Sequence, residues 1–504
     1  MKTRLAGKLG TASGWNLRSI TRLCAAIIVC LTFITPVILS EYDYSALQIF
    51  LTMLLLDVCL YPSYRYIMRG DSGVPVLQLL CLSYAVQFAL PIFTRDPIVE
   101  LAYDFAYLDN DDVVIALVMV IIGVIMMQLA FYVIRIRRIS NALPSVSLPL
   151  NVDRALVYCI SIFFLSLILG PVQSFLLGKD QVQFSSIIGL LQNQVLVAIG
   201  ILCWIVYTRG RSKWLKVLLY VIVLVTIIRG ASTAMLESVL VPIIVLFITR
   251  WIYTRRVPIV GFIVIGLMVL FLSPAKFDLR RSVAVEREAA TESTTTNRVF
   301  QWVELATDYW VSAFTQRRDF LESASDTTSR TDLIHQFAYI YASTPSLVPY
   351  QYGGSYKYFV VALIPRALWP GKPEANSVNN FYAINYGIST EQVLERSTFG
   401  VSLIGEGYMN FGVFGVLLAM ALQGLIISLL EHLFAGENSG AGGKAIFLAS
   451  LVFFLNGIGS SAEIMFGSVF QSMICACVLL WWAREPQKSL KGTSLGFIQS
   501  TSYR

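Results

Sequence analysis

Residues 274–400 contain nine arginines and only three lysines, a bias that points to one kind of chemistry. The guanidinium group is a planar fork that binds two phosphate oxygens at once, whereas an ammonium group acts as a point charge. We therefore expect two or three of these arginines to contact a phosphorylated ligand, while the others cover solvated surface or meet anionic lipid headgroups. The arginines are Arg280, Arg281, Arg287, Arg298, Arg317, Arg318, Arg330, Arg366 and Arg396, and the lysines are Lys276, Lys357 and Lys372.

Two further ionisable residues lie where the chain becomes apolar enough to enter a membrane. Arg229 ends one apolar stretch, and Glu237 follows it near the start of the next. Charged groups at such positions are costly in lipid, so a functional role is the default hypothesis. Two interpretations stay open: these residues take part in binding or proton transfer, or they form an ion pair that joins two helices.

The most specific stretch of the sequence runs from residue 364 to residue 373. Pro365 and Pro370 restrict the backbone on either side of Arg366. Arg366 and Lys372 are therefore expected on a rigid frame, where their charges are aimed at a ligand.

A second specific stretch covers residues 400–412 and is rich in glycine, which permits close approach of the backbone. Its glycines are Gly400, Gly405, Gly407 and Gly412. Glu406 and Tyr408 are expected just before the next membrane span, at its mouth.

Hydropathy predicts that these residues belong to an all-α, polytopic integral membrane protein. Of 504 residues, 56% are hydrophobic and 14% are charged, and the apolar residues form blocks of about twenty, the length that crosses a bilayer as a helix. About twelve transmembrane helices are expected, with one long periplasmic loop that contains short amphipathic helices. The spans are expected at 23–40, 45–61, 74–93, 112–134, 155–177, 186–207, 214–229, 233–252, 258–273, 411–432, 445–458 and 463–482.

The distribution of basic residues predicts the orientation of these spans. If both termini are cytoplasmic, most of the 38 lysines and arginines fall in inside segments, whereas the short outside loops hold Arg95, Lys179 and Arg229. The chain then divides into spans one to nine over 1–273, a periplasmic loop over 274–400, spans ten to twelve over 401–483 and a basic cytoplasmic tail over 484–504. The net charge of +7 is explained by this topology and does not indicate nucleic acid.

Helical periodicity recurs inside the long loop. Apolar and aromatic residues from Val299 to Phe314 repeat at three- and four-residue steps, which predicts a helix capped by Asn297 that lies at the membrane interface or on the bundle. A second helix is expected over 332–343, carrying His335. The stretch 352–356 predicts a turn, and the apolar run that follows it is too short to span a membrane.

The two specific stretches resemble the bacterial oligosaccharide repeat-unit polymerases, the Wzy-type O-antigen polymerase family. That family carries a PR-x-LWP-x-KP-like stretch in a late periplasmic loop, then GE-x-Y-x-NFG-x-x-G leading into the next span. The matching residues here are Pro365, Arg366, Leu368, Trp369, Pro370, Lys372 and Pro373, then Gly405, Glu406, Tyr408, Asn410, Phe411, Gly412 and Gly415. Weaker similarity covers Ser329–Asp332 and Tyr350–Tyr356, so the resemblance extends over about 330–415.

The resemblance implies a metal-independent glycosyltransferase that joins undecaprenyl-diphosphate-linked repeat units at the periplasmic face of the inner membrane. The growing glycan would pass to a hydroxyl of a newly arrived unit, with no cofactor. Positive side chains would neutralise the leaving diphosphate, and a base, Glu406 by first choice, would take the hydroxyl proton. The catalytic candidates are Glu406, Arg366, Arg330, His335 and Glu237, and the diphosphate-binding candidates are Arg229, Arg280, Arg281, Lys372 and Tyr408. Expected partners are the lipid-linked oligosaccharide, membrane lipids, a chain-length regulator and a flippase.

Other functions fit parts of the same sequence. A lipid-linked oligosaccharide flippase or transporter would share the hydropathy and the intramembrane charges, although such proteins usually show internal repeats. An O-antigen ligase would share the chemistry of glycan transfer from a lipid diphosphate. A non-enzymatic assembly partner is a further alternative. Metal chemistry is not expected, because the chain has two histidines, His335 and His432, and no cysteine in residues 274–400.

Overall fold

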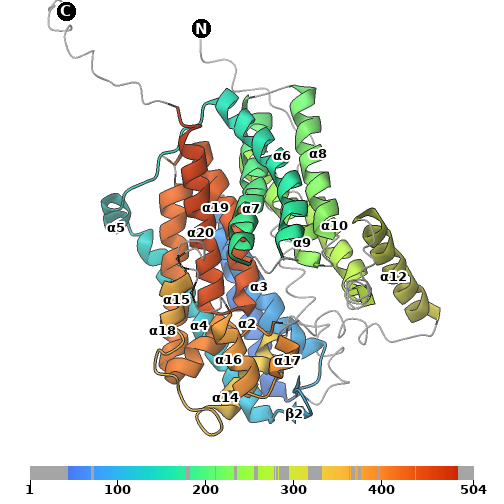
Figure 1. Ribbon diagram of the computed structural model, residues 1–504. Helices are drawn as coiled ribbons and strands as arrows, with labels where there is room; N and C mark the ends of the chain where they lie inside the picture. The colour runs from blue at the N-terminus through green and yellow to red at the C-terminus, as the bar shows by residue number, and fades with distance from the viewer. Residues whose placement is uncertain are drawn as a thin grey trace, which may run out of the picture.

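The computed structural model describes residues 44–69, 73–177, 182–209, 212–231, 235–254, 259–276, 278–279, 282, 295–315, 332–362, 364, 369, 371–372, 376–394, 398–436 and 439–485. Within these residues the chain is almost entirely helical, as Figure 1 shows. In the described part of the chain, ten helical segments are long and apolar enough to cross a membrane, so the expectation of an all-α polytopic membrane protein is confirmed at this level.

The helices before residue 260 follow the expected spans closely. They are α2 (Ala46–Arg69), α3 (Val76–Tyr84) with the π-helical η2 (Ala85–Ala89) and the 3₁₀ turn η3 (Leu90–Phe93), α4 (Asn110–Ile134), α5 (Arg137–Ala142), α6 (Val152–Leu177), α7 (Val182–Trp204) with the π-helical η4 (Ile205–Arg209), α8 (Lys213–Ala231) and α9 (Leu236–Thr254). The first expected span, 23–40, lies outside the described residues. The acidic loop after η3 contains an antiparallel ribbon, β1 (Ile98–Glu100) paired with β2 (Phe105–Tyr107), which the sequence did not predict.

The remaining helices are α10 (Ile259–Leu272), α12 (Thr295–Thr315), α14 (Leu333–Ser343), α15 (Lys357–Ala362), α16 (Ser377–Asn385), α17 (Glu391–Leu394), α18 (Leu403–Ala435), α19 (Gly440–Asn456) with the 3₁₀ turn η6 (Gly457–Gly459), and α20 (Ala462–Trp481). The expected ninth span corresponds to α10, whose 14 residues are fewer than a perpendicular crossing requires.

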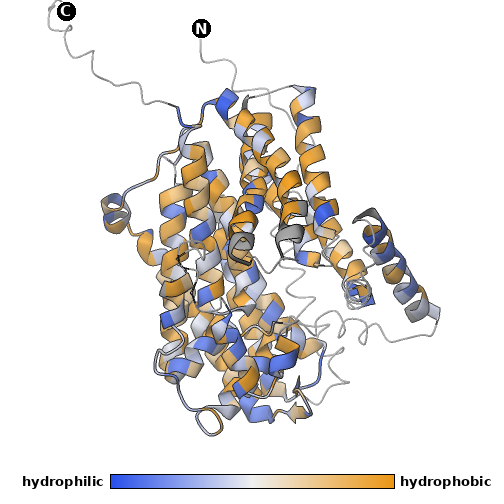
Figure 2. Cartoon of the chain, in the orientation of Figure 1, coloured by the Kyte–Doolittle hydropathy of each residue, from blue (hydrophilic) through white to orange (hydrophobic). Residues whose placement is uncertain are grey.

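Small residues allow the central helices to approach closely, which is the usual basis of packing between membrane helices. Gly424 of α18 lies against the backbone of α4 at Met127, and Gly123 of α4 lies against Val416 and Met420 of α18. Gly200 of α7 meets Ala445 of α19. Figure 2 shows the resulting bundle as predominantly hydrophobic.

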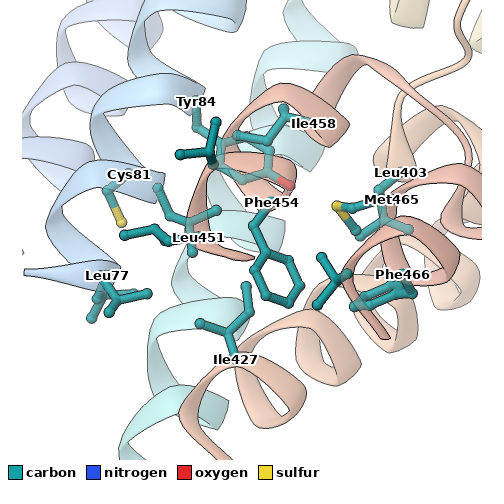
Figure 3. Close-up of a cluster of buried hydrophobic side chains, with 14 of the residues drawn as sticks. Leu77, Cys81, Tyr84, Leu403, Ile427, Leu451, Phe454, Ile458, Met465 and Phe466 are labelled. Atoms are coloured by element: carbon teal, nitrogen blue, oxygen red, sulfur yellow. The ribbon is translucent and has the colours of Figure 1, made fainter. Parts of the chain in front are cut away.

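The core of the bundle lies where α3, α18, α19 and α20 meet, as drawn in Figure 3. Leu77, Cys81 and Tyr84 of α3 are buried there together with Phe454 of α19 and Met465 of α20. The Tyr84 hydroxyl donates to Gln423 Oε1 at 2.7 Å, so the polar atom of this aromatic side chain is satisfied inside the core.

Helix α12 packs against α8 and α10 at one side of the bundle (Figure 1). The indole nitrogens of Trp302 and Trp310 each donate to a carbonyl at the end of α10, at 3.1 Å to Leu272 and 3.1 Å to Phe271. The predicted amphipathic helix is therefore confirmed. Its predicted cap is wrong, because α12 begins at Thr295 and Asn297 lies within its first turn.

The end of the bundle at which α18 and α20 begin carries a cap made of α14, α16, α17 and the β1–β2 ribbon (Figure 1). We call this the cap end. Helix α14 packs against α4 and α18, and the backbone N–H of Ala102 in the ribbon donates to Gly387 O after α16 at 2.9 Å. The helix predicted over 332–343 is confirmed as α14, and the turn predicted over 352–356 is also present.

Candidate functional site

Six of the ten candidate residues lie in the described part of the chain: Glu406, His335, Glu237, Arg229, Lys372 and Tyr408. The other four candidates, Arg366, Arg330, Arg280 and Arg281, lie outside the described residues. Glu406, His335, Lys372 and Tyr408 belong to segments of the cap end, whereas Arg229 and Glu237 belong to α8 and α9.

Glu406 lies in the first part of α18, and the longer part of this helix, which follows a kink, corresponds to the expected span 411–432. The helix begins at Leu403, and its first eight residues precede a kink at Phe411 and Gly412. The Glu406 side chain is buried, with 1% of its surface exposed, so it does not stand open at a helix mouth. The kink places Gly412 at φ +61°, a conformation that glycine adopts without steric cost.

Both carboxylate oxygens of Glu406 accept hydrogen bonds. The Ser355 hydroxyl donates to Oε1 at 2.6 Å, and the backbone N–H of Ala462 donates to Oε2 at 2.7 Å. Ala462 is the first residue of α20, whose leading N–H groups have no partner within their own helix. Glu406 therefore supplies a side-chain cap to α20 and joins two spans to the loop that contains Ser355.

Asn410 extends this arrangement to the turn over residues 350–356. Its side-chain amide donates to Ser355 Oγ at 2.8 Å and to the Glu406 carbonyl at 2.8 Å, while its Oδ1 accepts from the Gly353 N–H at 2.9 Å. The backbone N–H groups of Gln351 and Tyr352 donate to the carbonyls of Met409 and Asn410. We call Glu406, Ser355, Asn410 and the Ala462 N–H the Glu406 network.

His335 lies in a second buried chain of contacts. Asp332 caps α14 by accepting from the His335 N–H at 3.2 Å, and its Oδ2 lies 2.7 Å from His335 Nδ1 and 3.3 Å from Arg95 NH1. The Tyr44 hydroxyl lies 2.9 Å from His335 Nε2 and donates to Arg95 O at 2.5 Å. Both ring nitrogens of His335 are thus engaged, and the imidazole joins the segment before α2 to the cap.

Tyrosine rings fill the space between α14 and the start of α18. Tyr408 contacts Phe337, Tyr341 and Tyr350, with ring centroids 6.0, 5.6 and 6.2 Å away. Tyr352 continues the cluster, with its ring centroid 6.2 Å from that of Tyr350.

Two phenols of the cap end, both outside the membrane-spanning helices, stay protonated at neutral pH. Burial raises the pKa of Tyr356, and the nearby Glu406 carboxylate adds to this effect. Burial likewise raises the pKa of Tyr386 to about 12. The hydroxyls of these residues are therefore neutral groups that can donate hydrogen bonds.

Lys372 is buried, and its ammonium group donates to the carbonyls of Ala362 and Ile364 at 3.4 and 2.9 Å, where α15 ends. A cation at this position is favoured by the helix dipole. Lys372 also lies within electrostatic reach of Glu463 in the first turn of α20. It therefore connects α15 with α20.

Arg229 and Glu237 have contacts on other helices. Arg229 donates to the Ser166 carbonyl of α6 at 2.7 Å and to its hydroxyl at 3.3 Å. Glu237 accepts from the Asn456 amide of α19 at 2.6 Å. These contacts join α6 to α8 and α9 to α19, so each residue has a clear structural role in holding the bundle together.

Sequence reasoning did not single out Glu463, Arg95 or Tyr44. Four carboxylate side chains in the described part are buried: Asp332, Glu406, Glu431 and Glu463. Of these, Glu463 has an oxygen, Oε2, without a hydrogen-bond partner in the described part of the chain. Its position at the start of an expected span was a usable signal, because an ionisable group at the edge of a membrane span is costly to bury and is a functional hypothesis by default. The pairing of Tyr44 and Arg95 with residues far along the chain left no local signal.

Comparison with known proteins gives one match. No curated protein and no solved structure matches the chain. The model of a family described as a domain of unknown function, DUF8712, matches residues 145–488, which is more than half of the chain and includes α6–α10 and the helices from α12 to α20. The chain therefore belongs to the DUF8712 family.

Proposed function

We propose that this protein polymerises lipid-diphosphate-linked oligosaccharide repeat units at the outer face of a bacterial inner membrane. The reacting groups would meet at the cap end. The growing glycan is the donor, and a hydroxyl of the next lipid-linked unit is the acceptor.

The observation that carries this proposal is the meeting of the segments that resemble the Wzy-type polymerases. The turn over 350–356 and the stretch 405–412 are distant in sequence, yet the Glu406 network holds them against each other. Lys372, from the 364–373 stretch, reaches the same end of α20 as Glu406. Tyrosine rings and neutral hydroxyls surround this meeting point, and such groups suit a polyhydroxylated ligand.

The reaction requires positioning and charge neutralisation more than it requires a strong nucleophile. The acceptor hydroxyl oxygen forms a bond to the anomeric carbon of the donor, the bond from that carbon to the diphosphate oxygen breaks, and the diphosphate leaves with the electron pair. Arginines of the 274–400 segment, Arg366 first among them, would bind the leaving diphosphate as its charge develops.

The hydroxyl proton must pass to a base. Glu406 and His335 are fully engaged in hydrogen bonds, so positioning is the role that their contacts favour. Glu463 retains a buried carboxylate oxygen without a partner among the described residues, which makes it the stronger candidate for the base at this end of the bundle.

Deletion of the gene in its host, followed by gel analysis of surface glycan, tests the function. We expect glycans of one repeat unit in the deletion strain and a ladder of long chains after complementation with the wild type. Arg366→Ala should lower polymerisation roughly 10²–10³-fold, as the loss of a transition-state contact does, while expression stays normal. Arg396→Ala, from the same segment but outside the two specific stretches, serves as the matched control and should restore the ladder.

Other outcomes of this experiment favour other functions. Loss of all exported glycan would indicate a flippase. Accumulation of long chains that stay on the lipid carrier would indicate a ligase. A normal ladder in the deletion strain would refute the proposal.

A further inference from the structure

Tyr352 has an unusual backbone conformation for its residue type. Its φ angle is +47°, in the left-handed region, where side chains with a Cβ atom are disfavoured. The side chain is also 77% exposed, so burial of the ring does not compensate for this conformation. A strained backbone that presents an exposed aromatic ring is a reason to look for a ligand.

The strain at Tyr352 is imposed from both sides by the Glu406 network. The N–H groups of Tyr352 and Gly353 bind Asn410 through its carbonyl and its side-chain Oδ1, at 3.1 and 2.9 Å. Gly353 follows with φ +87°, and Ser355 anchors the end of the turn on Glu406. These hydrogen bonds therefore fix the backbone from which one exposed ring projects.

Aromatic residues adjoin Tyr352 on the turn and on the kink of α18. Tyr350 lies edge-on to Tyr352, and Tyr356 stacks on Phe411 with ring planes 29° apart. Gly353 lies so close to the Phe411 ring that an added Cβ would stand 3.2 Å from it, and Phe411 is 38% exposed. The exposed rings of Tyr352 and Phe411 therefore lie beside the partly exposed rings of Tyr350 and Tyr356.

We propose that Tyr352 and these neighbouring rings form a glycan subsite, in which a sugar ring stacks on Tyr352. The inference rests on the proposed function, since the glycan would be the saccharide part of the lipid-linked substrate. An aromatic anchor in the lipid interface is held by its depth and needs no fixed ring orientation. The imposed backbone conformation therefore favours a glycan over a lipid headgroup.

Binding and stability of the purified full-length protein in detergent test this inference. The probe is a set of soluble oligosaccharides cut from the host strain's own surface polysaccharide, with binding measured by calorimetry. Tyr352→Phe should bind within about twofold of the wild type because the ring remains, whereas Tyr352→Ala should bind at least about tenfold more weakly. Tyr103→Ala removes another exposed tyrosine of the cap end, 91% exposed on the ribbon, and should bind as the wild type does.

The variant Tyr352→Gly distinguishes the effect of backbone strain on stability from the contribution of the ring to binding. Glycine adopts a positive φ without steric cost, so this variant should melt about 1–3 °C above the wild type while it loses oligosaccharide binding. A lower melting temperature for Tyr352→Gly, or equal binding by the wild type and Tyr352→Ala, would overturn the subsite.

Separate results test the alternative that Tyr352 is a lipid anchor and test the proposed function itself. The tryptophan introduced in Tyr352→Trp adds its own fluorescence to that of the protein. If brominated phosphatidylglycerol quenches this added fluorescence and oligosaccharide does not change it, the ring is a lipid anchor and the subsite is refuted. Normal long chains in the deletion strain would refute polymerisation, and the oligosaccharide titration would still decide the role of Tyr352.

Discussion

Buried carboxylates at the cap end differ in how completely their oxygens are used. Glu406 accepts from Ser355 and from the Ala462 N–H, and Asp332 binds His335 and Arg95. Glu463, equally buried, keeps one oxygen without a partner in the described part of the chain. Removing a partner from a buried donor costs about 1–3 kcal/mol, so these residues should respond differently to the same substitution.

Glu406→Gln should destabilise the protein, whereas Glu463→Gln should not. The amide of a glutamine at 406 has one acceptor oxygen, so either the Ser355 hydroxyl or the Ala462 N–H loses its acceptor, at a cost of about 1–3 kcal/mol. At 463, an amide group replaces a carboxylate oxygen that has no hydrogen-bond partner among the described residues, so no hydrogen bond to that oxygen is lost. Melting temperatures of the two purified variants in the same detergent give the comparison, and equal losses would contradict the role assigned to the Glu406 network.

Helix α18 is the element that connects the cap with the membrane bundle. Its kink at Phe411 and Gly412 brings Gly407 against Gly415, where a Cβ on Gly407 would lie 2.7 Å from the Gly415 carbonyl oxygen. Beyond the kink, the same helix packs along α4. The glycines thus allow one helix to change direction between two packing surfaces.

Gly412→Ala should therefore lower stability, and Gly266→Ala should not. Gly412 has φ +61°, and an added Cβ would lie 3.2 Å from the Tyr350 hydroxyl, so alanine should cost about 1–2 kcal/mol. Gly266, inside α10, has no atom within 4 Å of an added Cβ and an ordinary φ, so alanine there should be neutral or stabilising. Thermal unfolding of the two variants is the measurement. A stable Gly412→Ala protein would show that the kink relaxes without cost.

The two ends of the whole bundle differ in composition. Basic residues at the helix ends opposite the cap include Arg135, which binds Glu431 at 2.8 Å, and Arg154, which donates to the Trp482 carbonyl. Lys444 and Arg484 lie at the same end, near the start of α19 and just beyond α20. The positive-inside rule predicts that such an end lies in the cytoplasm and that the cap end lies outside.

Cysteine labelling in intact cells tests this orientation. Ser346→Cys lies on an exposed turn of the cap after α14, and Arg138→Cys lies on exposed α5 at the opposite end. A membrane-impermeant maleimide should label Ser346→Cys in intact cells and Arg138→Cys after permeabilisation, each compared with the parent protein. The reverse pattern would invert the topology and remove the proposed outer-face reaction.

The sequence by itself determined the class of the protein and most of its helices. Apolar runs of membrane length, the amphipathic pattern of α12 and the turn over 352–356 are local signals, so they could be recognised without knowledge of the fold. The resemblance to the Wzy-type polymerases, which also rests on local stretches of sequence, marked Glu406 and His335 as candidates. They could not show that both side chains are fully engaged by residues from other parts of the chain.

The tertiary structure alone decided which residues meet. Tyr44 reaches His335 across 291 positions, and Ser355 reaches Glu406 across 51, and neither pairing has a local pattern. The sequence did not predict the short first part of α18, because a glycine-rich stretch has weak helix propensity, whereas packing against α14 and the bond from Ser355 stabilise it as helix. Hydropathy measures how a residue partitions into lipid, and the partners of a buried polar group depend on which distant segments the fold brings within 3 Å of it.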